Sequence, residues 1–589
     1  MKDNIKPQRK TTIVLLLVAI AAAMYLISIK LAYPVFQNTR LIDPLAEIHS
    51  LPALYYIAIA MIAAAGFICL IYRIQNKGIH ILLLILLAIM LWYTPYYLAE
   101  FVKMPGSPWH VGVAMHIPEV LAGQPIAFSS YAQQFPGSFI FHYLCVNIPG
   151  IEPMRYIYLF PLFSLCLFLL LCYTFISRLF SPRVAFLSLL LAIPCLHYFE
   201  LHPSPHVLGL LLMMTVLVLL MKQGIAAVIV AVIVTLVMIT SHPITPLLLC
   251  VFLGAGVVTS CLYHRKFGKA QAALAAMLVF CFAGWFLWPT LQVSPPGAAV
   301  APPGAAVAPP GAAVAPPALT EHTVGVWEDI RPESFETTHQ LLVGETFIYS
   351  GINNLKQGTY FLYGLLAVAA LIYVLLRAYS KNADRKKWLA SFGGLSKSEI
   401  FMTLSALLFL ILTVLLIERH AGLTERSLSF LILSLSCVIA SITTKFLHIH
   451  INKKSVIAAP IAVLLFLATF SFPLGAYGQE AYTGCPASEE NGLEFLSANV
   501  SLNEKTISMG GAGQLAFYSP YSITSQPGSG KRDLYAFRST DYYRAAMRQD
   551  LSFEDNRFTR LLNRVEADSK YNKVYCNPAF QVYLRGAIY

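Results

Sequence analysis

Histidines and carboxylates gather in the segments between the long apolar runs of this 589-residue chain. Eleven of the fifteen histidines fall in segments that we expect on one face of a membrane, namely His49, His110, His116, His142, His197, His202, His206, His242, His322, His339 and His420. Carboxylates at the same level include Asp43, Glu47, Glu100, Glu119, Glu152, Glu200, Glu418 and Glu425. Ionisable side chains near hydrocarbon are costly and tend to face a cavity, a partner or a site. The pattern predicts a polar cavity on that face.

Histidine spacing offers a metal-site hypothesis that the neighbouring prolines weaken. His202 and His206 lie four residues apart, which on a regular helix would place both rings on one face. Pro203 and Pro205 disfavour a regular helix there. We therefore interpret the pair as marking a turn between two helices, and we assign no metal ligands from the sequence.

Membrane helices must position these residues, because the composition excludes a soluble fold. Hydrophobic residues make up 57% of the chain and charged residues 12%, with a mean hydropathy of +0.65. An average soluble protein has roughly 45–50% and 25%. A soluble core cannot absorb that much apolar surface with so few charges to cover it. The sequence predicts an all-α polytopic membrane protein.

Thirteen apolar segments are candidate spans under a requirement of about 20 residues. They lie at 12–32, 52–73, 79–98, 154–177, 184–199, 206–222, 224–241, 244–263, 270–289, 358–377, 400–417, 427–443 and 455–474. The segments between 184 and 222 are the shortest, since Pro194, Pro203 and Pro205 interrupt them.

Basic loops orient these predicted spans. The residues before the first span include Lys2, Lys6, Arg9 and Lys10, which predicts a cytoplasmic N-terminus. Alternation then places basic loops such as YRIQNKG, SRLFSPR and RAYSKNADRKK inside, so the net charge of +12 is an orientation signal and indicates no nucleic-acid partner. We expect a multi-pass plasma-membrane protein with an extracytoplasmic C-terminal domain. The first run also fits a cleaved signal peptide, and either interpretation leaves the next loop outside.

The outer loop 99–153 holds the most informative pattern. After Pro108, the run WHVGVAMHIPEVLAG is typical of a helix lying along the interface, with Trp109 as a headgroup-level anchor and Gly123 as its stop. Residues 134–137 then turn the chain back toward the membrane. Segment 136–148 is too short for a confident span, and it fits a re-entrant helix, an interfacial helix or the outer end of the next span.

The order of these residues resembles the first large outer loop of GT-C-type polytopic glycosyltransferases, in particular archaeal-type members. The matching residues are Trp109-His110, Gly123, and Tyr131 followed by Phe135-Pro136-Gly137. Ser241-His242-Pro243 at a helix junction and Glu425-Arg426-Ser427 at the start of a span are similar to that group too. The likeness covers roughly residues 40–480. The sequence departs from it just before Trp109, where Ser107 and Pro108 replace the family's acidic residue.

The resemblance implies transfer of a sugar from a polyprenyl-phosphate donor in the membrane. Such a transfer needs a carboxylate that accepts the acceptor's proton or holds a divalent cation beside the phosphate. We place Glu100 first, Asp43 second and Glu47 third in that role. The implied substrate-binding residues are Trp109, His110 and His242, together with Arg419 and Arg426, whose charge can neutralise the departing phosphate.

Two further segments differ from the membrane domain, 1–478. Residues 295–317, within an outer loop 290–357, hold three copies of PPGAAVA and form a semi-extended spacer. Residues 479–589 have the composition of a small α/β soluble domain, with strands at KTISM and KVYCN. Cys485 and Cys576 are its cysteines and can pair in an oxidising compartment, and Asn499 begins a glycosylation sequon.

Two other functions fit the same sequence. A transporter or flippase would show inverted repeats and mid-span charges, whereas the charges here lie at the span boundaries. A non-catalytic envelope or surface-layer-associated protein would use the membrane domain as a base for residues 479–589. The absence of an acidic residue directly before Trp109 favours this second alternative.

Overall fold

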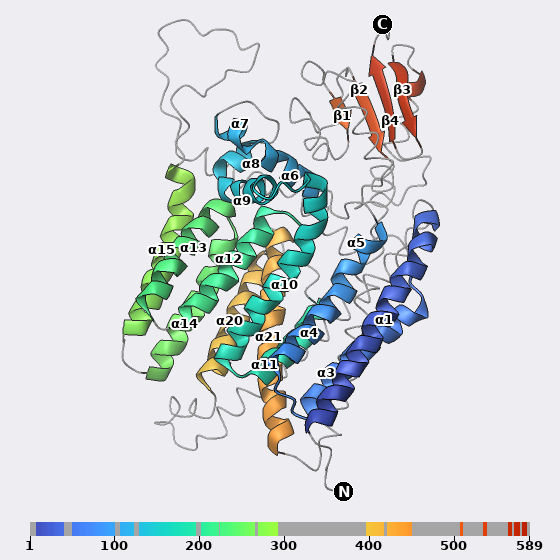
Figure 1. The fold of residues 1–589 in the computed structure, drawn as a ribbon. Helices are drawn as coiled ribbons and strands as arrows, with labels where there is room; N and C mark the ends of the chain where they lie inside the picture. The colour runs from blue at the N-terminus through green and yellow to red at the C-terminus, as the bar shows by residue number, and fades with distance from the viewer. Residues whose placement is uncertain are drawn as a thin grey trace, which may run out of the picture.

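The computed structural model describes a helical bundle and parts of a C-terminal sheet (Figure 1). The described residues are 7–39, 50–99, 106–122, 129–195, 202–222, 224–264, 269–291, 396–416, 421–449, 507–509, 534–538, 564–567, 571–577 and 580–585. The predicted spans 358–377 and 455–474 and the PPGAAVA spacer lie outside them.

The first helices form an antiparallel group. They are α1 (Pro7–Thr39), α3 (Ala53–Ile71), α4 (Lys77–Ala88) and α5 (Thr94–Ala99), the last two joined by a π-helix, Ile89–Tyr93. Asn76 caps α4, where its Oδ1 accepts from the backbone N–H of Ile79 at 3.3 Å.

Short helices gather at one end of the bundle as a cap (Figure 1). They are α6 (Gly106–Met115), α7 (Ile117–Leu121), α8 (Ser129–Gln134) and α9 (Pro136–Asn147). The helix predicted after Pro108 is therefore present, broken at His116, and the predicted turn at 134–137 separates α8 from α9. Gly150, with φ of +66°, then reverses the chain into the next long helix.

The remaining long helices run up and down between the two ends of the bundle (Figure 1). They are α10 (Pro153–Leu179), α11 (Pro182–Ala192), a 3-10 turn (Ile193–Cys195), α12 (Pro205–Leu220), α13 (Ile225–Ser241), α14 (Thr245–His264), α15 (Lys269–Leu291), α20 (Lys397–Leu416) and α21 (Ala421–Ile449). Ser181 and Ser204 cap α11 and α12, each with a proline at the first helical position.

Five of the described helices are long and apolar enough to cross a membrane, by length and composition. They are Arg9–Phe36, Ala53–Ile71, Pro153–Leu179, Lys397–Val414 and Ser427–Lys445, and shorter apolar helices accompany them. The chain is therefore a helical membrane protein. The count of thirteen spans stays a prediction.

Aromatic rings and small polar residues pack the centre of the bundle. Phe252 of α14 contacts Phe409 of α20 and Phe430 of α21, with ring centroids 5.0 and 5.7 Å apart. Along α21, Ser434 and Ser436 are fully buried among apolar neighbours. Small side chains let membrane helices approach closely, which fits the tight packing of α21 between α11 and α20.

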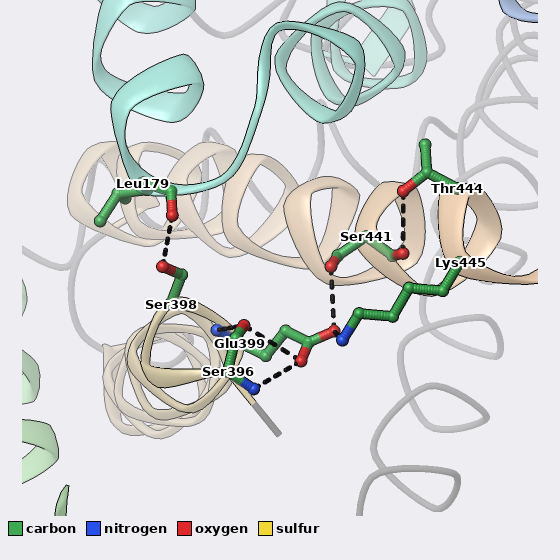
Figure 2. Close-up of polar contacts among 7 residues, drawn as sticks. All are labelled: Leu179, Ser396, Ser398, Glu399, Ser441, Thr444 and Lys445. Carbon is green, nitrogen blue, oxygen red and sulfur yellow. Dashed lines mark hydrogen bonds and ion pairs between the residues drawn. The ribbon is translucent and has the colours of Figure 1, made fainter. Parts of the chain in front are cut away.

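A buried carboxylate ties α20 to its neighbours at the end opposite the cap (Figure 2). Ser396 and Glu399 form a capping box: the Ser396 N–H donates to Glu399 Oε2 at 2.8 Å, and the Glu399 N–H donates to Ser396 Oγ at 3.2 Å. Glu399 Oε1 accepts from Ser441 Oγ at 2.9 Å and from Lys445 Nζ at 2.5 Å, both on α21. Ser398 donates to the last carbonyl of α10.

The C-terminal strands form one four-stranded sheet in the order β1-β2-β4-β3. The strands are β1 (Ile507–Met509), β2 (Leu534–Arg538), β3 (Tyr571–Asn577) and β4 (Phe580–Arg585). β1 pairs with β2 in parallel, and the other pairs are antiparallel. The strands predicted at KTISM and KVYCN are confirmed as β1 and β3, while the α/β domain 479–589 as a whole stays a prediction.

Candidate functional site

Five histidines from separate elements meet beneath the cap, and we call them the histidine cluster. His110 lies on α6 and His142 on α9, His202 precedes α12, His206 lies in its first turn, and His242 follows α13. His142, His202, His206 and His242 are buried, with exposed fractions of 0%, 6%, 6% and 4%. The cluster therefore joins the cap to the bundle.

Local sequence explains how these segments converge. Ser204 Oγ accepts from the Val207 N–H at 3.4 Å, which starts α12 just after His202. Gly209 lies one turn later, where an added Cβ would come within 2.5 Å of Thr245 Oγ1. The glycine therefore permits α12 to approach the α13–α14 junction closely enough to bring His206 and His242 together.

Ring contacts define the cluster in two pairs. His110 stacks near His202 with ring centroids 5.7 Å apart, and His206 lies 5.3 Å from His242. Phe139 of α9 packs near His110 at 6.1 Å, and Phe160 of α10 lies 5.1 Å from His142. Aromatic rings thus pack against His110 and His142.

Two hydrogen bonds fix individual rings. Thr245 contacts Nδ1 of His242 twice, through Oγ1 at 2.8 Å and through its backbone N–H at 3.3 Å. Because a backbone N–H only donates, Nδ1 accepts, and the proton of a neutral His242 lies on Nε2. His142 Nδ1 lies 2.6 Å from the hydroxyl of Tyr156 on α10.

Burial favours the neutral form of His110 and His142. Desolvation is the main cause that lowers the pKa of His110 well below its ordinary value, and the nearby His202, His142 and His242 add to it. Desolvation and His202 lower the pKa of His142 to about 3. Neutral imidazoles both donate and accept hydrogen bonds, so these two rings are suited to bind uncharged hydroxyl groups.

The described residues do not form a metal centre. Among them, no group of three or more histidine, cysteine, aspartate or glutamate side chains has an arrangement that could hold a metal ion. His202 and His206 do not share a regular helix, because α12 begins only at Pro205.

Glu119 adds a carboxylate to the cap that the sequence analysis did not include among its catalytic candidates. It lies on α7, and its Oε2 is covered, with no hydrogen-bond partner among the described residues. Its signal in the sequence is its place three residues after His116 in the interfacial helix, a spacing too common to single it out.

A tyrosine-rich segment leads to the position of Glu100. The π-helix releases the carbonyl of Met90, which accepts from the hydroxyls of Tyr55 and Thr94, each at 2.6 Å. Such π-turns recur at functional sites. Tyr93 anchors the same turn, donating to the Tyr158 carbonyl of α10 at 2.6 Å. Ala99, the last residue of α5, directly precedes Glu100 in the sequence.

The structure brings together part of the predicted site. His110 and His242 both belong to the histidine cluster. Trp109 lies on α6 and Arg426 on the first turns of α21, whereas Cys576 lies on β3. The predicted residues outside the described ones are Asp43, Glu47, Glu100, Arg419, Cys485 and Asn499.

Sequence reasoning did not select His142, His202 and His206 as site residues. His142 was visible only as a member of the large set of histidines on one face, and the spacing of His202 and His206 was interpreted as a turn. Their grouping depends on tertiary contacts between α6, α9, α12 and α13, which no spacing along the chain reports.

No protein-family model and no curated protein matches the chain. Solved structures give weak similarities. The oligosaccharyltransferase of Archaeoglobus fulgidus in its apo form has a TM-score of 0.48 at 12% identity, over 77% of this chain and 65% of that chain. This chain thus spans a little under two thirds of that protein's length.

ArnT from Cupriavidus metallidurans bound to undecaprenyl phosphate gives a TM-score of 0.44 at 12% identity, over 85% of this chain and 97% of that one. The archaeal oligosaccharyltransferase and ArnT are GT-C-type membrane glycosyltransferases, the class that the sequence resembles. Similarities at this level assign no activity, substrate or partner to this chain.

Proposed function

We propose that the chain is an integral-membrane glycosyltransferase that takes a sugar from a polyprenyl-phosphate donor at the outer membrane face. The observation that supports it best is the histidine cluster: a buried, polar group of hydrogen-bonding side chains between a helical bundle and its cap. A lipid tail is soluble among the apolar helices, whereas its sugar needs polar contacts near the membrane surface.

In this proposal the neutral imidazoles bind sugar hydroxyls, and the charged chemistry belongs to other residues. A carboxylate, with Glu100 first, Asp43 second and Glu47 third, accepts the proton of the attacking acceptor group. The acceptor then bonds to the anomeric carbon as the bond from that carbon to the phosphate oxygen breaks. Arg419 and Arg426 are proposed to neutralise the polyprenyl phosphate that leaves.

The contacts of α1 and α5 support the ranking of Glu100 and Asp43. Tyr25 of α1 and Thr94 of α5 are hydrogen-bonded at 3.0 Å between their hydroxyls. Both helices run toward the cap end, where α1 ends at Thr39 and α5 at Ala99 (Figure 1). Asp43 follows the first end by four residues and Glu100 follows the second directly.

Sugar transfer in membranes tests the proposal. Membranes that contain the full chain receive dolichyl-phosphate-linked or undecaprenyl-phosphate-linked hexose with a radiolabel, and loss of the sugar from the lipid is measured. Replacing Glu100→Gln should lower the rate by about 100-fold or more, the usual contribution of a general base. Asp43→Asn, tested separately, should also lower it.

Glu152→Gln is the matched control, because this exposed carboxylate lies at the same end of the bundle, just before α10. It should transfer sugar at the wild-type rate. Wild-type rates in both the Glu100 and the Asp43 variants would remove the carboxylate assignment. No transfer by the unaltered chain, with specific capture of a protein by residues 479–589 of the full chain, would favour the envelope-protein alternative.

A further inference from the structure

Two arginines lie at the end of the bundle opposite the cap, at the ends of two helices that contact each other. Arg73 follows α3, and Arg183 is the second residue of α11. Desolvation is the main cause that lowers the pKa of Arg183, and the positive charge of Arg73 lowers it further. Arg183 directly precedes the predicted span 184–199. Like charges repel, so an anion near both side chains would be favourable here.

Their guanidinium groups have covered donors. Nη2 of Arg73, and Nε and Nη2 of Arg183, are shielded from solvent and have no hydrogen-bond partner among the described residues. A covered donor without an acceptor is costly, and more so for a charged group. An orientation signal alone would leave these side chains in water, where their donors are satisfied.

The backbone conformation at Arg73 is one in which an arginine is unusual. Helix α3 ends in a Schellman motif, in which the N–H of Ile74 donates to the carbonyl of Cys69 at 3.0 Å. Arg73 occupies the position after the C-cap with φ of +55°, a left-handed conformation that favours glycine. An arginine there strains the backbone, which indicates that its side chain is needed.

Other features at this end add positive potential, and the described residues there include no carboxylate that is still available. Arg183 lies at the N-terminus of an 11-residue helix, where the backbone dipole favours anions. Glu399, at the same end, already accepts from Ser396, Ser441 and Lys445 (Figure 2).

We propose that Arg73 and Arg183 together bind a phosphate group, carried by an anionic lipid headgroup or by a soluble phosphate. Guanidinium groups match phosphate oxygens in paired hydrogen bonds. One anion between the two groups would satisfy the covered donors and remove the repulsion. This site lies at the opposite end of the bundle from the histidine cluster and does not depend on the proposed sugar transfer.

Binding by the purified full chain tests the site with two probes. Native mass spectrometry in neutral detergent compares how many phosphatidylglycerol and how many phosphatidylcholine molecules stay bound to the protein. Calorimetry measures the binding of inorganic phosphate. Arg183→Gln and Arg73→Gly should each weaken binding of the anionic probe, phosphatidylglycerol or inorganic phosphate, by at least about tenfold. This is the effect expected for loss of one charged hydrogen-bonding group. Lys222→Gln is the control, since it removes an exposed charge at the same end.

Arg73→Gly separates binding from folding. Glycine adopts φ of +55° without strain, so this variant should unfold at no lower temperature than wild type when no phosphate is present. Arginine-dependent binding of phosphatidylglycerol alone identifies a lipid headgroup as the source, and arginine-dependent binding of inorganic phosphate identifies a soluble one. If the wild type binds neither probe, or the arginine variants bind as the wild type does, the site is wrong.

Discussion

Protonation of His142 is opposed by its surroundings, and this makes stability depend on pH. The folded-state pKa is about 3, against about 6.5 for an unfolded chain. Above pH 6.5 the ring is neutral in both states. Between those values the unfolded state holds one more proton, so stability falls as the pH falls, by roughly 1.4 kcal/mol per pH unit for one such group.

We expect the thermal-unfolding temperature of the full chain in nanodiscs to fall as the pH is lowered from about 6.5 to about 4.5. His142→Gln keeps a hydrogen-bonding group beside Tyr156 but cannot titrate, so it should flatten this dependence. His116→Gln, outside the cluster, should leave the dependence steep. Equal slopes in the wild type and the His142 variant would contradict the burial argument.

At the same scale, sequence could predict which residue types matter but not which of them meet. His110 and His242 were selected because each belongs to a recognisable motif. His142 lies in the middle of an apolar helix, and the two prolines between His202 and His206 suggest only a turn. Their shared site depends on the close approach at Gly209 and on the packing of α9 against α6, α12 and α13, which are tertiary contacts.

At the scale of elements, apolar length predicts helices well because a membrane span is a local property. The segments 12–32 and 427–443, for example, fall inside α1 and α21. The boundaries differ: α1 runs for 33 residues, beyond the apolar run at both ends. The strands β2 and β4 were not predicted, because each becomes a strand by pairing with the other, as in Leu534 with Leu584.

The contact between α20 and α21 carries a prediction at this scale. Glu399 is 1% exposed while Lys445 is 39% exposed. Lys445→Met removes the countercharge and leaves the buried carboxylate with Ser396 and Ser441 only, which should cost about 2 kcal/mol of unfolding free energy. Thermal unfolding of the full chain in detergent measures it.

The double variant Glu399→Gln with Lys445→Met should recover part of that loss, because it leaves no charge without a partner. Recovery of unfolding free energy in the double variant would show that Lys445 stabilises the fold through its charge, and not only through packing of its methylene groups. Lys77→Met is the control, an exposed lysine at the start of α4 and at the same end of the bundle. Equal losses in the single and double variants would show that the charge pair contributes nothing.

At the scale of the whole molecule, the two candidate sites lie at opposite ends of one bundle. The histidine cluster lies where α6 and α9 of the cap meet α12 and α13, and the arginine pair lies where α3 ends and α11 begins (Figure 1). The strands β1–β4 lie toward the cap end (Figure 1). If the basic loops face the cytoplasm, the cap and the sheet share the outer face, where a lipid-linked sugar would be used.

Cysteine labelling in intact cells tests this orientation. Lys573 on β3 and Lys222 after α12 are both exposed and belong to opposite ends. A membrane-impermeant maleimide should label Lys573→Cys directly, and Lys222→Cys only after the membrane is opened. The unsubstituted chain measures the background from native thiols such as the exposed Cys261. The reverse pattern would put the histidine cluster on the cytoplasmic face, and the proposed outer-face transfer would then be wrong even if the carboxylates proved essential.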